Sequence, residues 1–177
     1  MTSVIRTSSR VRLGSVVAAA AVAAGALGLV APATASAATV TKTVFVDAKT
    51  AGADGVFAAS GVDVAAGSTV SVTATGQASF DPGYRSDTAG PDGFSDLNCT
   101  DSVAPCVLNG QPFIALIGKV GTGDPVVVGA GPKILAGSGP LSFAVNDNID
   151  GFANNTGGFE VTITYTPPCT GLFCFGS

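Results

Sequence analysis

Apolar and polar residues alternate along much of the chain after residue 38, with turn-forming residues between the alternating stretches. In Thr69–Thr75, for example, Val70, Val72 and Ala74 are separated by Ser and Thr. A period of two is typical of strands that bury one face. The pattern predicts these strands: Val40–Val46, Val56–Val64, Thr69–Thr75, Phe113–Val120, Pro125–Val128, Leu141–Val145 and Phe159–Thr166. Because no helical apolar period occurs in this part, we expect an all-β fold, a small antiparallel β-sandwich of the jelly-roll kind.

The first 37 residues follow a different pattern. Three arginines between residues 6 and 12 precede an apolar run from Val16, and small residues close it at Ala35-Ser36-Ala37. This order is typical of a secretory signal peptide that is cleaved after Ala37. The alternative, an uncleaved membrane anchor, lacks a positively charged stop-transfer flank. We therefore expect a secreted, extracellular protein without stable membrane insertion, and the Ala-rich signal is typical of bacterial export.

Residues 38–177 are acidic. They carry all twelve acidic side chains of the chain but only five of its eight basic ones, which leaves a formal charge of −7. Nucleic acids and anionic membranes bind proteins through clustered Lys and Arg, so we expect neither as a partner. The length suits a single domain, which we assign to residues 38–166, followed by a short tail at 167–177.

Four cysteines in an exported chain predict disulfide bonds. They allow three pairings, and the short spacings favour Cys99–Cys106 and Cys169–Cys174. In the chain-entropy model each of these small loops contributes roughly 2–3 kcal/mol. The second pair lies in the tail, whose apolar residues either cover one end of the sandwich or form a contact surface.

The chain contains no histidine. This absence excludes Ser-His-Asp and Cys-His catalysis and most transition-metal sites. Two carboxylates at a set separation can hydrolyse a glycoside. The only glutamate, Glu160, lies in a predicted strand, and nothing in the sequence indicates which two aspartates would stand at that separation. We therefore expect a protein that is not an enzyme.

The connection between the last two predicted strands is rich in side-chain oxygens. In the segment NDNIDGFANNTGGF, six of the first ten residues are Asn or Asp: Asn146, Asp147, Asn148, Asp150, Asn154 and Asn155. These residues are common in turns, yet a hairpin needs only about two to five residues. Calcium takes carboxylate, amide and carbonyl oxygens. An EF-hand loop is excluded, because its position twelve, which requires Glu, is Gly157 here. A calcium site and a plain hydrophilic turn are the two interpretations of this segment.

The spacing ND-x₇-NN-[ST]-G-x-F, from Asn146 to Phe159, resembles the calcium loop of the bacterial galactose-binding, PA-I-like lectins. Three other pieces resemble that family and follow its order: ATGQASFDP at Ala74–Pro82, GPDG at Gly90–Gly93 and, after a cysteine pair, ALIGKVG at Ala115–Gly121. The resemblance covers roughly residues 40 to 166. It implies a galactose-binding-like β-sandwich with one calcium ion, which also coordinates two sugar hydroxyls.

Carried over by position, the resemblance implies calcium ligands in the side chains of Asp147, Asn154 and Asn155 and in the backbone carbonyls of Gly151 and Phe80. It also implies sugar contacts from these residues: Asp147, Asn148, Asn154 and Phe80. One matched carboxylate implies a modest calcium dissociation constant of roughly 10⁻⁴–10⁻³ M. The implied partner is a galactose-like or other glycan, and a homo-oligomer remains open.

The sequence departs from the family around the expected sugar pocket. FSDLN at Phe94–Asn98 stands where the family carries a His-Pro segment, Phe80 lacks a hydroxyl group, and Gly151 offers a sugar no side chain. These departures weaken the inference of galactose specificity more than that of the calcium site. An alternative function is a structural or surface-interaction sandwich in which calcium stabilises the loop and no sugar binds.

Overall fold

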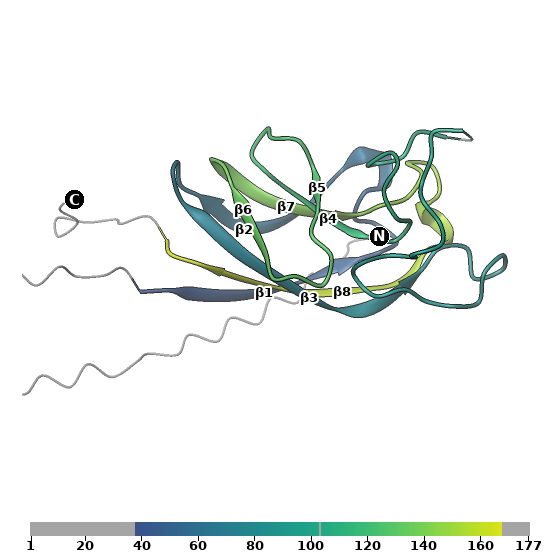
Figure 1. Ribbon diagram of the computed structural model, residues 1–177, viewed down its shortest axis with the longest axis horizontal. Coiled ribbons are helices and arrows are strands. Elements are labelled where there is room, and N and C mark those ends of the chain that lie inside the picture. Colours follow the sequence, from purple (N-terminus) through teal and green to yellow (C-terminus); the bar gives the residue numbers. More distant parts are fainter. Residues whose placement is uncertain (1–37, 103, 168–177) are drawn as a thin grey trace, which may run out of the picture.

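The computed structural model describes residues 38–102 and 104–167, and in this part eight strands form two four-stranded antiparallel sheets (Figure 1). The strands are β1 (Val40–Asp47), β2 (Ala58–Val64), β3 (Thr69–Ser79), β4 (Leu116–Val120), β5 (Val126–Val127), β6 (Lys133–Ala136), β7 (Gly139–Val145) and β8 (Thr156–Tyr165). One sheet has the order β1-β8-β3-β6 and the other β2-β7-β4-β5. Two short 3₁₀ helices, η1 (Ala53–Gly55) and η2 (Phe152–Asn154), lie in connections. The predicted all-β antiparallel sandwich is confirmed.

Apolar side chains from both sheets fill the space between them. On β3, Val70 and Val72 are buried while Thr73 is exposed, as the alternation predicts. On the facing sheet, Leu141 and Phe143 of β7 have no exposed surface. Burying a side chain of this kind contributes about 1.5–3 kcal/mol. The apolar faces therefore hold the two sheets together, and the polar faces point to solvent.

Two predicted strands begin two or three residues too early, and in both cases a backbone hydrogen bond diverts the chain. β2 begins two residues later than predicted, because the Val56 carbonyl accepts a bond from Gly52 N (2.9 Å) and so closes a turn. β4 begins three residues later than predicted. There Ile114 has a φ of +64°, and its N–H donates to the Asn146 carbonyl (2.7 Å). A β-branched residue rarely adopts this conformation, and the local sequence pattern does not predict it.

β6 was not predicted from the sequence. Its four residues are too few to show a clear alternation, although Leu135 is buried and Ile134 is 60% exposed. The pairing of Leu135 with Val70 of β3 places the leucine on the inner face of the sheet. Pairing with β3 therefore specifies this edge strand more than its own sequence pattern does.

The two long connections, 80–115 and 146–155, lie at the same end of the sandwich (Figure 1). The first follows β3 and the second precedes β8, and the pairing of Ser79 with Thr156 brings these two junctions together. An isolated bridge between Cys106 and Asn148 joins the connections directly. The segment 146–155 thus meets both the end of β3 and the loop that contains Cys99 and Cys106, which we call the cysteine loop.

Several predictions concern parts of the chain that lie outside the described residues. These parts are the signal peptide at 1–37, the tail from residue 168, and the cysteines Cys169 and Cys174. Within residues 38–102 and 104–167, none of the helices has the length and apolar character needed to cross a membrane.

Candidate functional site

The connection between β7 and β8 folds back on itself because its middle is anchored in the core. Phe152 of η2 is only 2% exposed and packs in the hydrophobic core. A Cβ atom on Gly52 would lie 2.5 Å from the Phe152 ring, so the neighbouring chain must be glycine at this point. A turn from Asn148 to Gly151 (O–N 2.8 Å) and a bond from Asn155 N to Phe152 O (3.2 Å) complete the reversal. The two ends of the connection therefore meet.

Asp147 and Asn155 form a buried polar pair where these ends meet. They are 3% and 1% exposed, and Asn155 Nδ2 donates to Asp147 Oδ2 (2.8 Å) and to the Ala48 carbonyl (3.1 Å). Both partners accept only, which determines the orientation of the amide group. The opposite atom, Asn155 Oδ1, is buried and has no hydrogen-bond partner in the described part of the chain. Such an acceptor costs about 1–3 kcal/mol unless a ligand satisfies it.

The Asp147 carboxylate is buried without a basic partner. Both ion pairs among the described residues belong to Arg85. Burial raises the pKa of Asp147, and the hydrogen bonds from the Asn155 side chain and the Asn148 backbone amide partly oppose this rise. A buried carboxylate without a counter-charge is unfavourable, so a cation beside it would be strongly favoured.

The oxygen atoms at this point fit a hard cation. Asp147 offers a carboxylate and Asn155 an unpartnered amide oxygen, both of which calcium accepts. Gly151 lies beside the carboxylate, because a Cβ atom there would be 3.1 Å from Asp147 Oδ1. In the part of the chain that the structure describes, no three His, Cys, Asp or Glu side chains are grouped to hold a metal. A cation at this position therefore depends on amide and backbone oxygens in addition to one carboxylate.

Two other residues predicted for the site have different surroundings. Asn154 is exposed at the end of η2, next in the chain to the buried Asn155. The side-chain amide nitrogen of Asn148 donates to the Ala104 carbonyl (2.7 Å) and so holds the cysteine loop in place. Asn148 therefore has only its side-chain oxygen to offer a sugar. The ligand roles of both residues remain predictions.

Phe80 is positioned by the end of β3. It follows Ser79, which pairs with Thr156, so Phe80 and Asn155 each lie one residue beyond the same end of this pairing. The Phe80 carbonyl accepts a long hydrogen bond from the Ser79 hydroxyl (3.3 Å). Its ring, which is half-buried, stacks on Phe113 with the ring centroids 5.0 Å apart. Phe80 thus brings both a backbone carbonyl and an aromatic face to this end of the molecule.

The predicted Cys99–Cys106 disulfide is confirmed, with an Sγ–Sγ distance of 2.07 Å and Cα atoms 6.0 Å apart. The residue after it, Val107, donates its backbone N–H to the Asp147 carbonyl (2.9 Å). Together with the Asn148 bridge to Cys106, this contact fastens the cysteine loop to the candidate site.

Asn146 has a structural role that the sequence did not reveal. It is fully buried, and its Oδ1 accepts from Leu108 N (2.8 Å) while its Nδ2 donates to the carbonyls of Gln111 and Pro112 (both 3.1 Å). These bonds fasten the segment 108–112 beside Asp147, and they use both polar atoms of the Asn146 side chain. The only sequence signal for this role is its place directly after a buried strand.

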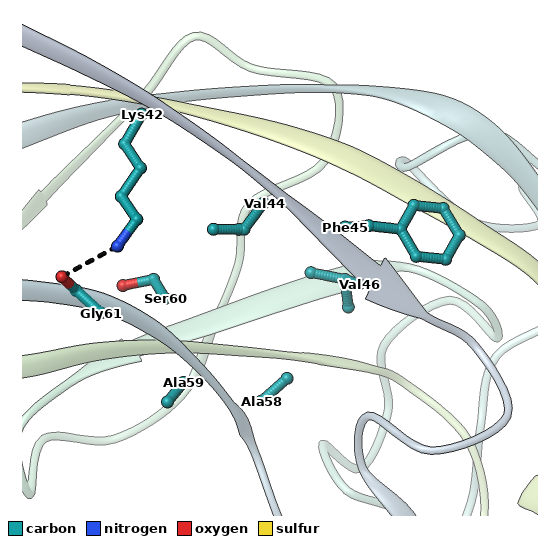
Figure 2. Close-up of a pocket in the computed structure, with 8 residues that line it drawn as sticks. All are labelled: Lys42, Val44, Phe45, Val46, Ala58, Ala59, Ser60 and Gly61. Atoms are coloured by element: carbon teal, nitrogen blue, oxygen red, sulfur yellow. Dashed lines mark hydrogen bonds between the residues drawn. The ribbon is translucent and has the colours of Figure 1, made fainter. Parts of the chain in front are cut away.

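Away from this site, a hollow lies between the open edges of the two sheets (Figure 2). This edge cavity has a volume of about 310 Å³ and is lined by residues of β1 and β2: Lys42, Val44, Phe45, Val46, Ala58, Ala59, Ser60 and Gly61. Lys42 Nζ donates to the Gly61 carbonyl (3.1 Å) and thereby links the two strands. The lining is mostly aliphatic, its one charge is positive, and it contains no carboxylate. Its chemistry does not fit a cation.

No protein-family model and no curated protein sequence matches this chain at a significant level. Among solved structures, one with a similar fold is described as the N-terminal domain of EclA, a PllA-like lectin. The alignment has a TM-score of 0.50 and 22% sequence identity, and it covers 70% of this chain and 94% of that one. At this identity the similarity concerns the fold alone.

Proposed function

We propose that this protein is a secreted, calcium-dependent carbohydrate-binding protein that acts without catalysis. The observation that carries this proposal is the buried Asp147–Asn155 pair, which leaves an unpartnered amide oxygen beside a carboxylate that lacks a basic partner. The lectin-domain fold of the solved neighbour and the lectin-like residue spacing from Asn146 to Phe159 support it. The Cys99–Cys106 disulfide supports export, because such bonds persist in oxidising compartments.

In this proposal the connection between β7 and β8 supplies most of the calcium ligands. Asp147, Asn154 and Asn155 contribute side-chain oxygens, and Gly151 and Phe80 contribute backbone carbonyls. Bound calcium would offer open coordination positions that vicinal sugar hydroxyls take in place of water. Hydrogen bonds from the exposed Asn154 amide would orient the sugar.

Calorimetry and a glycan array test the proposal. We expect the folded, oxidised protein to take up calcium with a dissociation constant of roughly 10⁻⁴–10⁻³ M. We also expect it to bind glycans only while calcium is present, so that a chelator removes the array signal. The variant Asp147→Ala should lose both activities, whereas Asp63→Ala, which removes an exposed carboxylate on β2, should retain both. Glycan binding that persists in Asp147→Ala would contradict the mechanism.

A structural role for calcium is the second candidate function. The observation that favours it is the set of bonds from Asn146, Asp147 and Asn148 to the segment that contains the disulfide, because a cation here would tie two connections together. In that case calcium raises the melting temperature, but no glycan binds at any calcium concentration.

A further inference from the structure

Tyr84 presents an unusually exposed aromatic ring at the loop end of the sandwich. It is 78% exposed, whereas the only other tyrosine of the chain, Tyr165, is half-buried. The Tyr84 ring centroid lies 6.3 Å from that of Phe80, at an interplanar angle of 45°. Because Phe80 stacks in turn on Phe113, the exposed ring is the outer member of a row of three aromatic side chains.

A compact turn holds Tyr84 in this position. The backbone N–H groups of Tyr84 and Arg85 both donate to the Asp81 carbonyl (2.8 and 3.0 Å), and Gly83 N donates to Asp81 Oδ1 (3.2 Å). Asp81 itself has a φ of +37°, which is uncommon for a residue other than glycine. Strained backbone of this kind persists where surrounding contacts hold it, and it is frequent at binding sites.

Arg85 braces the turn from its other side. Its guanidinium lies 4.1 Å from the ring centroid of Phe94, and it bonds Asp87 (Nε–Oδ1 2.6 Å) and Asp96 (Nη2–Oδ2 3.2 Å). The hydrogen bond from Arg85 keeps the pKa of Asp87 below its ordinary value, so the pair stays ionised at neutral pH. A ring presented on an ordered turn loses little conformational entropy when a ligand binds.

The aromatic row is continuous with the candidate calcium site. Phe80 follows Ser79, whose strand partner Thr156 is next in the chain to Asn155. At the other end of the row, Phe113 precedes Ile114, whose N–H donates to the carbonyl of Asn146, the residue before Asp147. A ligand held at Asp147 and Asn155 would therefore extend along the row toward Tyr84.

We infer that Tyr84, supported by Phe80, forms a second sugar subsite in which the apolar C–H face of the next unit of an oligosaccharide stacks on the exposed ring. Sugar rings carry such a face opposite their hydroxyl-rich edges, and aromatic side chains are the usual apolar surface of ligand sites. The inference rests on the proposed function, and it identifies the ligand as an oligosaccharide rather than a single sugar.

The test compares two probes on the calcium-loaded protein by calorimetry. The first is the tightest oligosaccharide found on the glycan array, and the second is the methyl glycoside of its terminal sugar. We expect the ratio of their affinities to fall by about 3- to 10-fold in Tyr84→Ala and to be restored in Tyr84→Phe. Tyr165→Phe is the matched control and should leave the ratio unchanged.

A spectroscopic measurement adds a second readout. The chain has two tyrosines and no tryptophan, so ligand stacking should change tyrosine fluorescence in the wild type and in Tyr165→Phe but not in Tyr84→Phe. An unchanged affinity ratio in Tyr84→Ala would overturn the subsite, whether both affinities stay the same or both fall by the same factor. If the wild type binds no glycan with calcium present, the proposed function itself fails, and the subsite fails with it.

Discussion

The edge cavity between β1 and β2 and the loop end around Asp147 differ in what they offer a ligand. The edge cavity has a measurable volume and an aliphatic lining, and its one charged group, Lys42, is already bonded to a carbonyl. The loop end instead contains a buried carboxylate and a buried amide oxygen without a partner. Open volume and unsatisfied polar groups therefore point to different regions of the molecule. The proposed site rests on the unsatisfied polar groups, because a ligand would offset the cost of burying them.

The largest expected effect separates two phenylalanines, one from each region. Phe152 anchors the loop end and is 2% exposed, whereas Phe45 lines the edge cavity and is 54% exposed. We expect Phe152→Ala to lower the free energy of unfolding by about 3–5 kcal/mol and to weaken calcium binding, because the connection loses its anchor. Phe45→Ala should cost less than about 1 kcal/mol. Denaturant titrations measure both, and similar losses would show that the anchor is not specific to the loop end.

Removal of the disulfide should have the next largest effect. In the double variant Cys99→Ser with Cys106→Ser we expect a loss of roughly 2–3 kcal/mol in the free energy of unfolding. We also expect weaker calcium binding, because Val107 and Asn148 hold the cysteine loop against the site. Thermal melts and calcium titrations of oxidised wild type and variant test this. Unchanged calcium affinity would indicate that the disulfide stabilises the fold without organising the site.

A pH titration should reveal a smaller contribution of Asp147 to stability, and the sign of its pH dependence should differ with and without calcium. Because burial raises the pKa of Asp147, the folded state binds its proton more tightly than the unfolded state does. In chelator, the contribution of Asp147 to stability should therefore increase as the pH falls through the raised folded-state pKa toward the ordinary aspartate pKa of about 3.9. With calcium present the trend should reverse, since protons compete with the ion.

The variant Asp147→Asn isolates this contribution from those of the other carboxylates. The difference in melting temperature between wild type and Asp147→Asn, each measured in chelator, should change with pH in that window. Parallel curves for the two proteins would contradict the assignment.

The smallest expected effect belongs to the edge cavity. Lys42→Met keeps much of the aliphatic stem and removes the hydrogen bond to the Gly61 carbonyl. We expect a change of less than about 1 kcal/mol in the free energy of unfolding and no change in calcium or glycan binding. Calorimetry on this variant sharpens the comparison, because altered glycan binding would assign a functional role to the cavity.

The sequence alone determined the features that depend on local pattern. Alternation of apolar residues predicted most of the strands, since a period of two places one face of each strand in the core. Close spacing predicted the Cys99–Cys106 pair, because a short loop brings two thiols together. The density of Asn and Asp identified residues 146–155 as a candidate calcium site or a hydrophilic turn, but it did not distinguish the roles of the individual side chains.

Those roles were decided by the tertiary structure. Asn146 and Asn155 are the same residue type in the same connection, yet one bonds to segment 108–112 and the other is left with an unpartnered oxygen. The difference depends on the left-handed backbone at Ile114, on the burial of Phe152 and on the register of β3 with β8. These are contacts between residues far apart in the chain, and a pattern read over neighbouring residues carries no information about which distant groups will satisfy a given polar atom.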